Sequence, residues 1–102
     1  MAYARAVAVE WDPEKDETNR AKHGLSFSEA SVLFDSEGDY LVIFDEAHSE
    51  SEDRFIAIGG MERGVAVIVF TEPDEDTIRI ISARWATVRE RSLYRSYKER
   101  GS

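Results

Sequence analysis

The stretch that decides the fold reads TIRIISARWATVRERSLYRSYKER and spans residues 77–100. Its first seven residues are rich in isoleucine, which favours a β-strand. Thr87 and Glu90 then stand three residues apart, the spacing of a capping box, in which each side chain binds the other residue's backbone N–H at the start of a helix. The stretch therefore predicts a strand over residues 77–83 that leads almost directly into a helix ending near Lys98.

Three more predicted strands precede this one at short spacing. Residues 65–70 (VAVIVF) are uniformly apolar, as in a buried strand. Residues 40–44 (YLVIF) and 54–60 (RFIAIGG) flank the acidic loop DEAHSESED, and the segments GMERG and TEPDED are predicted turns. Because consecutive strands joined by short turns pair with their neighbours, the run predicts an antiparallel meander.

The N-terminal part begins with a short predicted strand at residues 6–11, followed by a polar helix. Asp12 is a suitable N-cap, and Pro13 suits the first helical position. Gly24 suits the position just after the last turn. Because Ala21 is the one clearly apolar residue between these boundaries, we expect this helix to be exposed on most sides.

A second helix follows at once. Ser26 and Glu29 have capping-box spacing, and Gly38 predicts the end of the helix. Its apolar stripe is formed by Phe27, Ala30, Leu33 and Phe34. The element order β-α-α-β-β-β-β-α therefore predicts a single α+β domain over residues 1–102. In this domain a small antiparallel sheet is packed on one face by two N-terminal helices and one C-terminal helix.

The composition suits one folded domain. Of the 102 residues, 42% are hydrophobic and 33% are charged, which is enough for one modest core and too few residues for two. There is no cysteine, which excludes disulfides and fits a cytoplasmic protein. No apolar run approaches the roughly 18 residues that a membrane helix needs, so we expect no membrane association.

The charge is divided along the chain. Residues 1–77 hold 6 basic and 19 acidic side chains, residues 78–102 hold 7 basic and 2 acidic ones, and the formal net charge is −8. The acidic average argues against broad, non-specific nucleic-acid binding. It leaves room for a local anion site built from the C-terminal arginines, although the helix dipole alone explains cations such as Lys98 and Arg100.

Taken singly, the polar candidates also have structural explanations. His23 suits acid–base work near neutral pH, but it equally suits a helix C-terminus. Arg79 and Arg84 are five residues apart, so in a regular strand they point to opposite faces. They serve one site only if the strand ends or bulges near Ser82. Glu90 is sufficiently explained by its capping box.

A metal site is the weaker alternative. Asp45, Glu46 and His48 cluster in the acidic loop, where they would suit a metal-dependent hydrolase. Their spacing matches no recognised ligand pattern. We therefore predict a site without metal or cofactor.

Three blocks of the sequence together resemble one known family. They read EWDPEKDETNRAKHGLSFSEASVLF (10–34), HSESEDRFIAIGG (48–60) and IRIISARWATVRERSLY (78–94), and they cover most of the chain. The last block, with its I-R-I-I-S-A-R, A-T and E-R-x-x-Y elements, is the most specific. In these blocks the chain resembles the BrnT family, small RelE-like ribonuclease toxins of type II toxin–antitoxin systems.

The resemblance implies a RelE-like fold and a ribonuclease toxin that cleaves RNA and inhibits translation. It also implies neutralisation by a BrnA-like antitoxin with a ribbon-helix-helix DNA-binding domain, and either a toxin homodimer or a toxin–antitoxin heterotetramer. RNA carries its own nucleophile, the 2′-OH, so a metal-independent site needs only a base, an acid and cations on the phosphate.

The family's motif positions can be carried onto this sequence. The implied catalytic residues are His23, Arg79, Arg84, Lys22 and Arg54, and the implied substrate-binding residues are Arg91, Tyr94 and Glu90. We expect Arg79 and Arg84 to hold the phosphate. We expect His23 to do the acid–base work, with Lys22 and Arg54 in electrostatic support.

One departure from the family pattern bears on activity. Where the family often has an arginine before the IRIISAR strand, this chain has Pro73, followed by three acidic residues. The change removes a cation and adds negative charge beside the site. It motivates the alternative prediction of a catalytically weak or inactive toxin-fold module, whose role is antitoxin binding and promoter co-repression. The acidic surface would then attract a basic partner.

Overall fold

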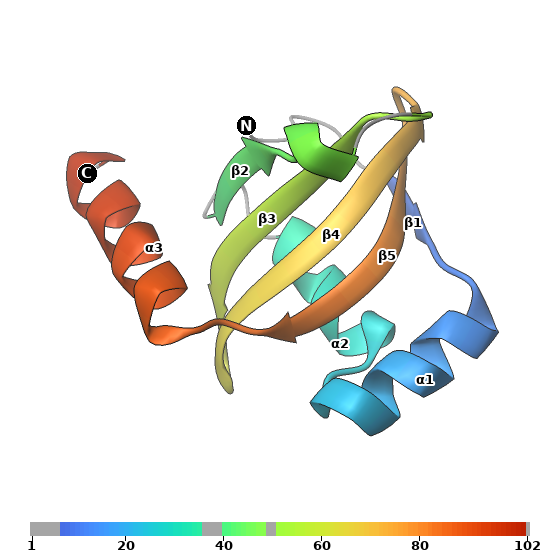
Figure 1. The fold of residues 1–102 in the computed structure, drawn as a ribbon, viewed down its shortest axis with the longest axis horizontal. Coiled ribbons are helices and arrows are strands. Elements are labelled where there is room, and N and C mark those ends of the chain that lie inside the picture. Colours follow the sequence, from blue (N-terminus) through green and yellow to red (C-terminus); the bar gives the residue numbers. More distant parts are fainter. Residues whose placement is uncertain (1–6, 36–39, 49–50, 102) are drawn as a thin grey trace.

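Five strands form one mixed sheet, with the spatial order β1-β5-β4-β3-β2 (Figure 1). The computed structural model describes residues 7–35, 40–48 and 51–101. The strands are β1 (Ala8–Glu10), β2 (Tyr40–Phe44), β3 (Arg54–Met61), β4 (Gly64–Asp74) and β5 (Thr77–Trp85). Strands β2 to β5 form the predicted antiparallel meander. β1 pairs in parallel with β5, so the prediction of a wholly antiparallel sheet is wrong at this one strand.

Within the described residues, three α-helices and two short 3₁₀ turns accompany the sheet. They are α1 (Pro13–His23), α2 (Phe27–Ser31), α3 (Val88–Gly101), η1 (Val32–Asp35) and η2 (Glu46–His48). Among the described residues, no helix combines the length and the apolar character that crossing a bilayer requires. Apart from the two 3₁₀ turns, the order of elements along the chain is the predicted β-α-α-β-β-β-β-α.

The ends of α1 follow their local signals. The Asp12 carboxylate accepts a hydrogen bond of 2.9 Å from the Glu14 backbone N–H, and Pro13 is the first helical residue. Gly24 has the left-handed φ of 70° that ends the helix, and its N–H binds the Arg20 carbonyl. The predicted boundaries of α1 are therefore confirmed.

The predicted capping box of Ser26 and Glu29, at the start of α2, forms only in part. The Ser26 hydroxyl accepts from the Glu29 N–H at 3.0 Å, but the Glu29 carboxylate binds the Arg63 guanidinium at 2.6 and 2.7 Å. This ion pair ties α2 to the turn between β3 and β4. The predicted helix end at Gly38 lies outside the described residues.

The segment TEPDED is not a turn throughout. β4 continues through Thr71 and Pro73 to Asp74, and its register with β5 shifts between Thr71 and Asp74. Because proline cannot donate a ladder hydrogen bond, it is tolerated at such an irregularity. The prediction ended this strand at residue 70, four residues too early, since Pro73 and the acids around it have a strong turn signature.

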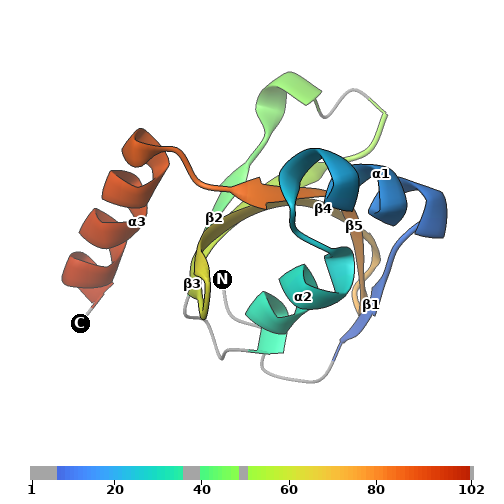
Figure 2. The same ribbon diagram turned by 90° about the horizontal axis from the view of Figure 1, so that it is seen from below.

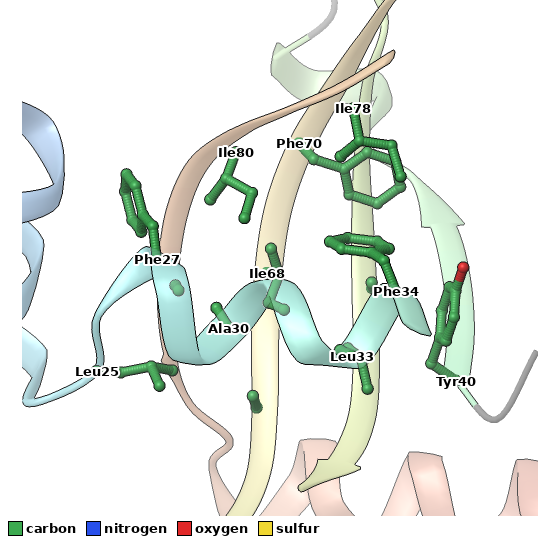
Figure 3. Close-up of a cluster of buried hydrophobic side chains, with 13 residues drawn as sticks. Leu25, Phe27, Ala30, Leu33, Phe34, Tyr40, Ile68, Phe70, Ile78 and Ile80 are labelled. Carbon is green, nitrogen blue, oxygen red and sulfur yellow. The ribbon is translucent and has the colours of Figure 1, made fainter. Parts of the chain in front are cut away.

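One sheet face is covered by α2 and η1 and carries the main core (Figure 3). Phe34 lies edge-on to Phe70 with ring centroids 5.1 Å apart. The buried residues of this helix-covered face include Leu25, Phe27, Ala30, Leu33, Tyr40, Ile68, Ile78 and Ile80. The predicted apolar stripe of the second helix is thus confirmed as core.

The C-terminal helix lies on the other side of the sheet. Figure 2 shows α2 and α3 on different sides of the strands. Tyr94 of α3 packs with Ile58 and Val67, which belong to the face opposite α2. Most of the helix projects outward, and Leu93 remains 47% exposed. The prediction that all helices cover one face is therefore wrong for α3.

Candidate active site

A β-bulge brings the two strand arginines onto one face. Arg79 pairs with Thr71 of β4, and Arg84 pairs with Val67, four residues earlier on the same strand. The register shifts by one residue at Ile81, which has no partner on β4. Because residues an even number apart share a face, Arg79 and Arg84 point to the same side, with about 13 Å between their positions along the sheet. The condition stated from the sequence, a bulge near Ser82, is therefore met.

Arg54 lies in the same row as Arg79. In the register of the sheet, Thr71 is opposite Arg54 on β3 and opposite Arg79 on β5. Directly paired residues have their side chains on one face. We call this side, opposite α2, the arginine face, and define it by Arg54, Thr71, Arg79 and Arg84.

Thr71 is a candidate site residue that was not predicted from the sequence. Its side chain is 1% exposed, and its hydroxyl has no hydrogen-bond partner within the described part of the chain. A buried hydroxyl without a partner costs free energy, so it needs an explanation. In the register of the sheet it lies between two arginines, and it would reach a bound anion only if the side chains that cover it moved. Its β-branched side chain, directly after the strand VAVIVF, is the one sequence feature that points to it. The segment TEPDED, which begins with Thr71, was instead predicted to be a turn.

Arg79 is held by the N-terminal strand. Its guanidinium donates to the Glu10 carboxylate at 2.7 Å, and both side chains are about half exposed. Glu10 is opposite Arg79 in the parallel β1–β5 pair. An exposed ion pair of this kind is weak, typically about 0–1 kcal/mol, so another anion can compete for Arg79.

Arg84 is held more firmly by Glu90 at the start of α3. Two hydrogen bonds of 2.7 Å join the guanidinium and the carboxylate. The same carboxylate accepts from the Thr87 N–H at 2.9 Å, and the Thr87 hydroxyl accepts from the Glu90 N–H at 3.2 Å. The predicted capping box is therefore confirmed, and it is shared with an arginine.

The ion pair shifts both ionisation equilibria. The hydrogen bonds from Arg84, joined by those from Thr87, lower the pKa of Glu90 to about 2, whereas burial acts in the opposite direction. The hydrogen bond from Glu90 raises the pKa of Arg84. Glu90 is thus a carboxylate at neutral pH, and it positions Arg84 rather than accepting protons.

The other two predicted substrate-binding residues have structural contacts. The Arg91 guanidinium donates to the Ala86 carbonyl at 3.1 Å. Tyr94 packs over β3, where a Cβ on Gly60 would lie 3.3 Å from its hydroxyl oxygen. Both residues belong to the first turns of α3, beside the arginine face. Their contacts join α3 to the sheet.

Lys22 and His23 lie at the edge of the sheet rather than on the arginine face. They line a cavity of about 450 Å³ between α1 and β5, which also includes Thr18, Ile81 and Ser82. Ser82 is opposite Val69, in the row between those of Arg79 and Arg84. The cavity therefore connects the end of α1 with the strand that carries both arginines.

Asn19 explains why α1 runs along this edge. Its side-chain amide donates to the Ala83 carbonyl at 2.7 Å and accepts from the Ala83 N–H at 3.1 Å. It thus pairs with β5 as a neighbouring strand would, and it also donates to the Leu25 carbonyl at 2.9 Å. Asn19 could not be singled out from the sequence, because a polar residue in a polar helix is expected to be exposed.

The metal-site alternative gains no support from the geometry. His48 pairs with the Asp45 carboxylate at 3.0 Å, within η2. Within residues 7–35, 40–48 and 51–101, no three His, Cys, Asp or Glu side chains are grouped so that they could hold a metal ion. The three arginines of the arginine face instead favour binding and stabilisation of an anion.

Two comparisons with known proteins identify the family of this chain. A family described as the ribonuclease toxin BrnT of type II toxin–antitoxin systems matches residues 11–90. The crystal structure of the Brucella abortus ribonuclease toxin BrnT superposes with a TM-score of 0.66 at 29% sequence identity, covering 80% of this chain and 99% of that one. A search of curated proteins found no match. The chain belongs to the BrnT family of ribonuclease toxins of type II toxin–antitoxin systems.

Proposed function

We propose that this chain is a metal-independent RNA endonuclease whose active site is the arginine face together with the end of α1. One observation carries the proposal. The bulge at Ile81 puts Arg79 and Arg84 on one face, where Arg54 and Thr71 lie in the row of Arg79, and the Thr71 hydroxyl has no partner among the described residues. Three arginines and a hydroxyl suit a phosphodiester, because its charge grows in the transition state.

In the proposed reaction, the RNA 2′-OH attacks the adjacent phosphorus. The bond from phosphorus to the 5′ oxygen breaks and leaves a cyclic phosphate. Arg79 and Arg84 bind the phosphate oxygens, with Arg54 adding charge and Thr71 donating one hydrogen bond. Each contact that strengthens as negative charge develops lowers the barrier.

His23 is the proposed acid–base residue. Its place beside Ser82, in the cavity at the β5 edge, supports a role between the two arginine rows. It would receive the 2′-OH proton and return it through a water molecule to the leaving 5′ oxygen, so that His23 ends the reaction neutral. Lys22, in the same cavity, would support the phosphate electrostatically. Arg91 and Tyr94 would contact RNA only on rearrangement, since each already has a structural contact.

Cleavage of cellular RNA would inhibit translation. We further propose neutralisation by a BrnA-like antitoxin with a ribbon-helix-helix domain, in a heterotetramer built on a toxin homodimer. The family's place in toxin–antitoxin systems supports an antitoxin partner.

A specific observation favours a second function. Both site arginines are engaged by acids, Arg79 by Glu10 and Arg84 by Glu90. Asp74 and its acidic neighbours stand at the same end of the sheet as Arg79. These carboxylates oppose RNA binding, which is consistent with a weak toxin retained for antitoxin binding and co-repression.

The deciding experiment measures cleavage of a single-stranded RNA oligonucleotide in EDTA. We expect cleavage by the wild type, and a loss of about 10²–10³-fold in Arg79→Ala and in Arg84→Ala. Arg95→Ala, on α3 but away from the site, is the charge-matched control. Full activity in both site variants would overturn the assignment. An inactive wild type that still binds its antitoxin would favour the second function.

A further inference from the structure

A groove between α3 and the edge strand β2 lies outside the proposed active site. It has a volume of about 280 Å³ and is lined by Leu41 of β2 and by Leu93, Ser96, Tyr97 and Arg100 of α3. Leu93 is 47% exposed, although it is a large apolar residue. Within the described part of the chain, β2 pairs with β3 alone, so the groove is accessible along this edge of the sheet.

The groove is mainly apolar, with Arg100 in its lining and Arg89 on the same helix face beyond the groove. Residues 93, 96, 97 and 100 follow the three- and four-residue spacing of one helix face, and Arg89 lies on the same stripe one turn earlier. Arg89 and Arg100 are eleven residues apart, about 16 Å along the helix. An occupant that matches the groove therefore carries apolar side chains between two acidic groups.

The positive charge of α3 indicates which kind of molecule would bind in the groove. The helix holds five Lys or Arg residues and two Glu residues, in a chain whose net charge is −8. A second copy of the chain fits poorly, because two α3 helices packed along this stripe would face each other with like charges. RNA would satisfy the arginines, but it would gain little from the apolar surface of Leu41 and Leu93.

We propose that this groove docks an acidic amphipathic segment of the antitoxin. Its apolar side chains would lie against Leu41, Leu93 and Tyr97, and its carboxylates would meet Arg89 and Arg100. An apolar centre inside a polar rim is the usual anatomy of a protein interface, and tyrosine and arginine are enriched among the residues that contribute most to binding. The inference rests on the proposed antitoxin partner and is independent of the ribonuclease site.

The test titrates the full chain with a purified BrnA-like antitoxin that carries a ribbon-helix-helix domain. We expect Leu93→Asp and Arg100→Glu each to weaken binding by at least about 30-fold. Ser96→Trp, which fills the groove without adding charge, is expected to weaken binding by about tenfold or more. Arg95→Glu makes the same charge change off the stripe and is the matched control, with an expected change below about threefold.

Two outcomes would overturn the proposal. One is unchanged antitoxin affinity in Leu93→Asp and Ser96→Trp, with thermal unfolding showing both variants folded. The other is loss of single-stranded RNA binding in these variants while antitoxin affinity is retained, which would make the groove an RNA site. RNA cleavage, measured in parallel, should be unchanged in Leu93→Asp. A wild type without cleavage would therefore count against the active site alone.

Discussion

The two faces of the sheet are built for different tasks. The helix-covered face is closed, with Phe27, Ile68 and Ile80 at most 1% exposed. The arginine face carries the half-buried aliphatic residues Ile43, Ile56 and Val69 beside its arginines, and the first turns of α3 pack against part of it. One face therefore supplies most of the burial that stabilises the fold, and the other is left available for ligands.

The difference shows how a small chain combines a core with a charged site. A 102-residue domain has little apolar surface to spare, so its second face stays only partly covered. Cations can gather there without a large desolvation cost, because solvent reaches them. The bulge at Ile81 interrupts the pairing of β4 with β5 at one residue, and it places Arg79 and Arg84 on the same face.

Truncation of a buried side chain should show the largest difference in stability between the two faces. Phe27→Ala, on the helix-covered face, is expected to lower the free energy of unfolding by about 3–5 kcal/mol, because it leaves a cavity among rigid neighbours. Ile56→Ala, on the arginine face, should cost only about 1–2 kcal/mol, because its surroundings are partly solvent. Urea unfolding followed by circular dichroism measures both. Equal losses would contradict the division into a structural and a functional face.

Glu90 tests the link between the arginine face and α3. Its folded pKa of about 2 lies below its ordinary 4.5, so the stabilisation is present above about pH 5 and is lost as the pH falls towards 2. We expect Glu90→Gln to remove about 1–2 kcal/mol at neutral pH and to flatten the dependence of stability on pH between about 5 and 2. This range allows for screening by solvent, since the Arg84 and Glu90 side chains are 39% and 25% exposed.

Stability measured at several pH values would check this expectation. Glutamine keeps the carbonyl that accepts from the Thr87 N–H, so the variant isolates the ion pair from the cap. Glu17→Gln, which removes an exposed carboxylate of α1, controls for net charge. An unchanged pH dependence in Glu90→Gln would show that the ion pair does not stabilise the fold.

Local sequence signals predicted the parts of the fold that depend on local physics. The boundaries of α1 follow from Asp12, Pro13 and Gly24, and the start of α3 follows from Thr87 and Glu90. Each is a contact between residues fewer than five positions apart. The meander was predictable for the same reason, because its strands are joined by short connections.

What depends on distant partners could not be predicted. The side of the sheet on which α3 packs is decided by Tyr94 and Gly60, far apart in the chain. The role of Asn19 depends on Ala83, 64 positions away. The relation of Arg79 to Arg84 was undecidable until the register placed Ile81 in a bulge. In the candidate site, the residue types were predictable but their alignment was not.

The smallest expected effect is also the most selective. Thr71→Val replaces the hydroxyl with a methyl group of similar shape. Because that hydroxyl has no partner within the described residues, the change should leave the free energy of unfolding unchanged or raise it by up to about 1 kcal/mol. RNA cleavage should fall by about tenfold, the equivalent of one neutral hydrogen bond to the phosphate.

Thr71→Ser, which keeps a hydroxyl, should retain more activity than Thr71→Val despite losing a buried methyl group. Such opposite orders of stability and activity would place Thr71 in the site, whereas a loss of both in Thr71→Val would make it a structural residue of β4.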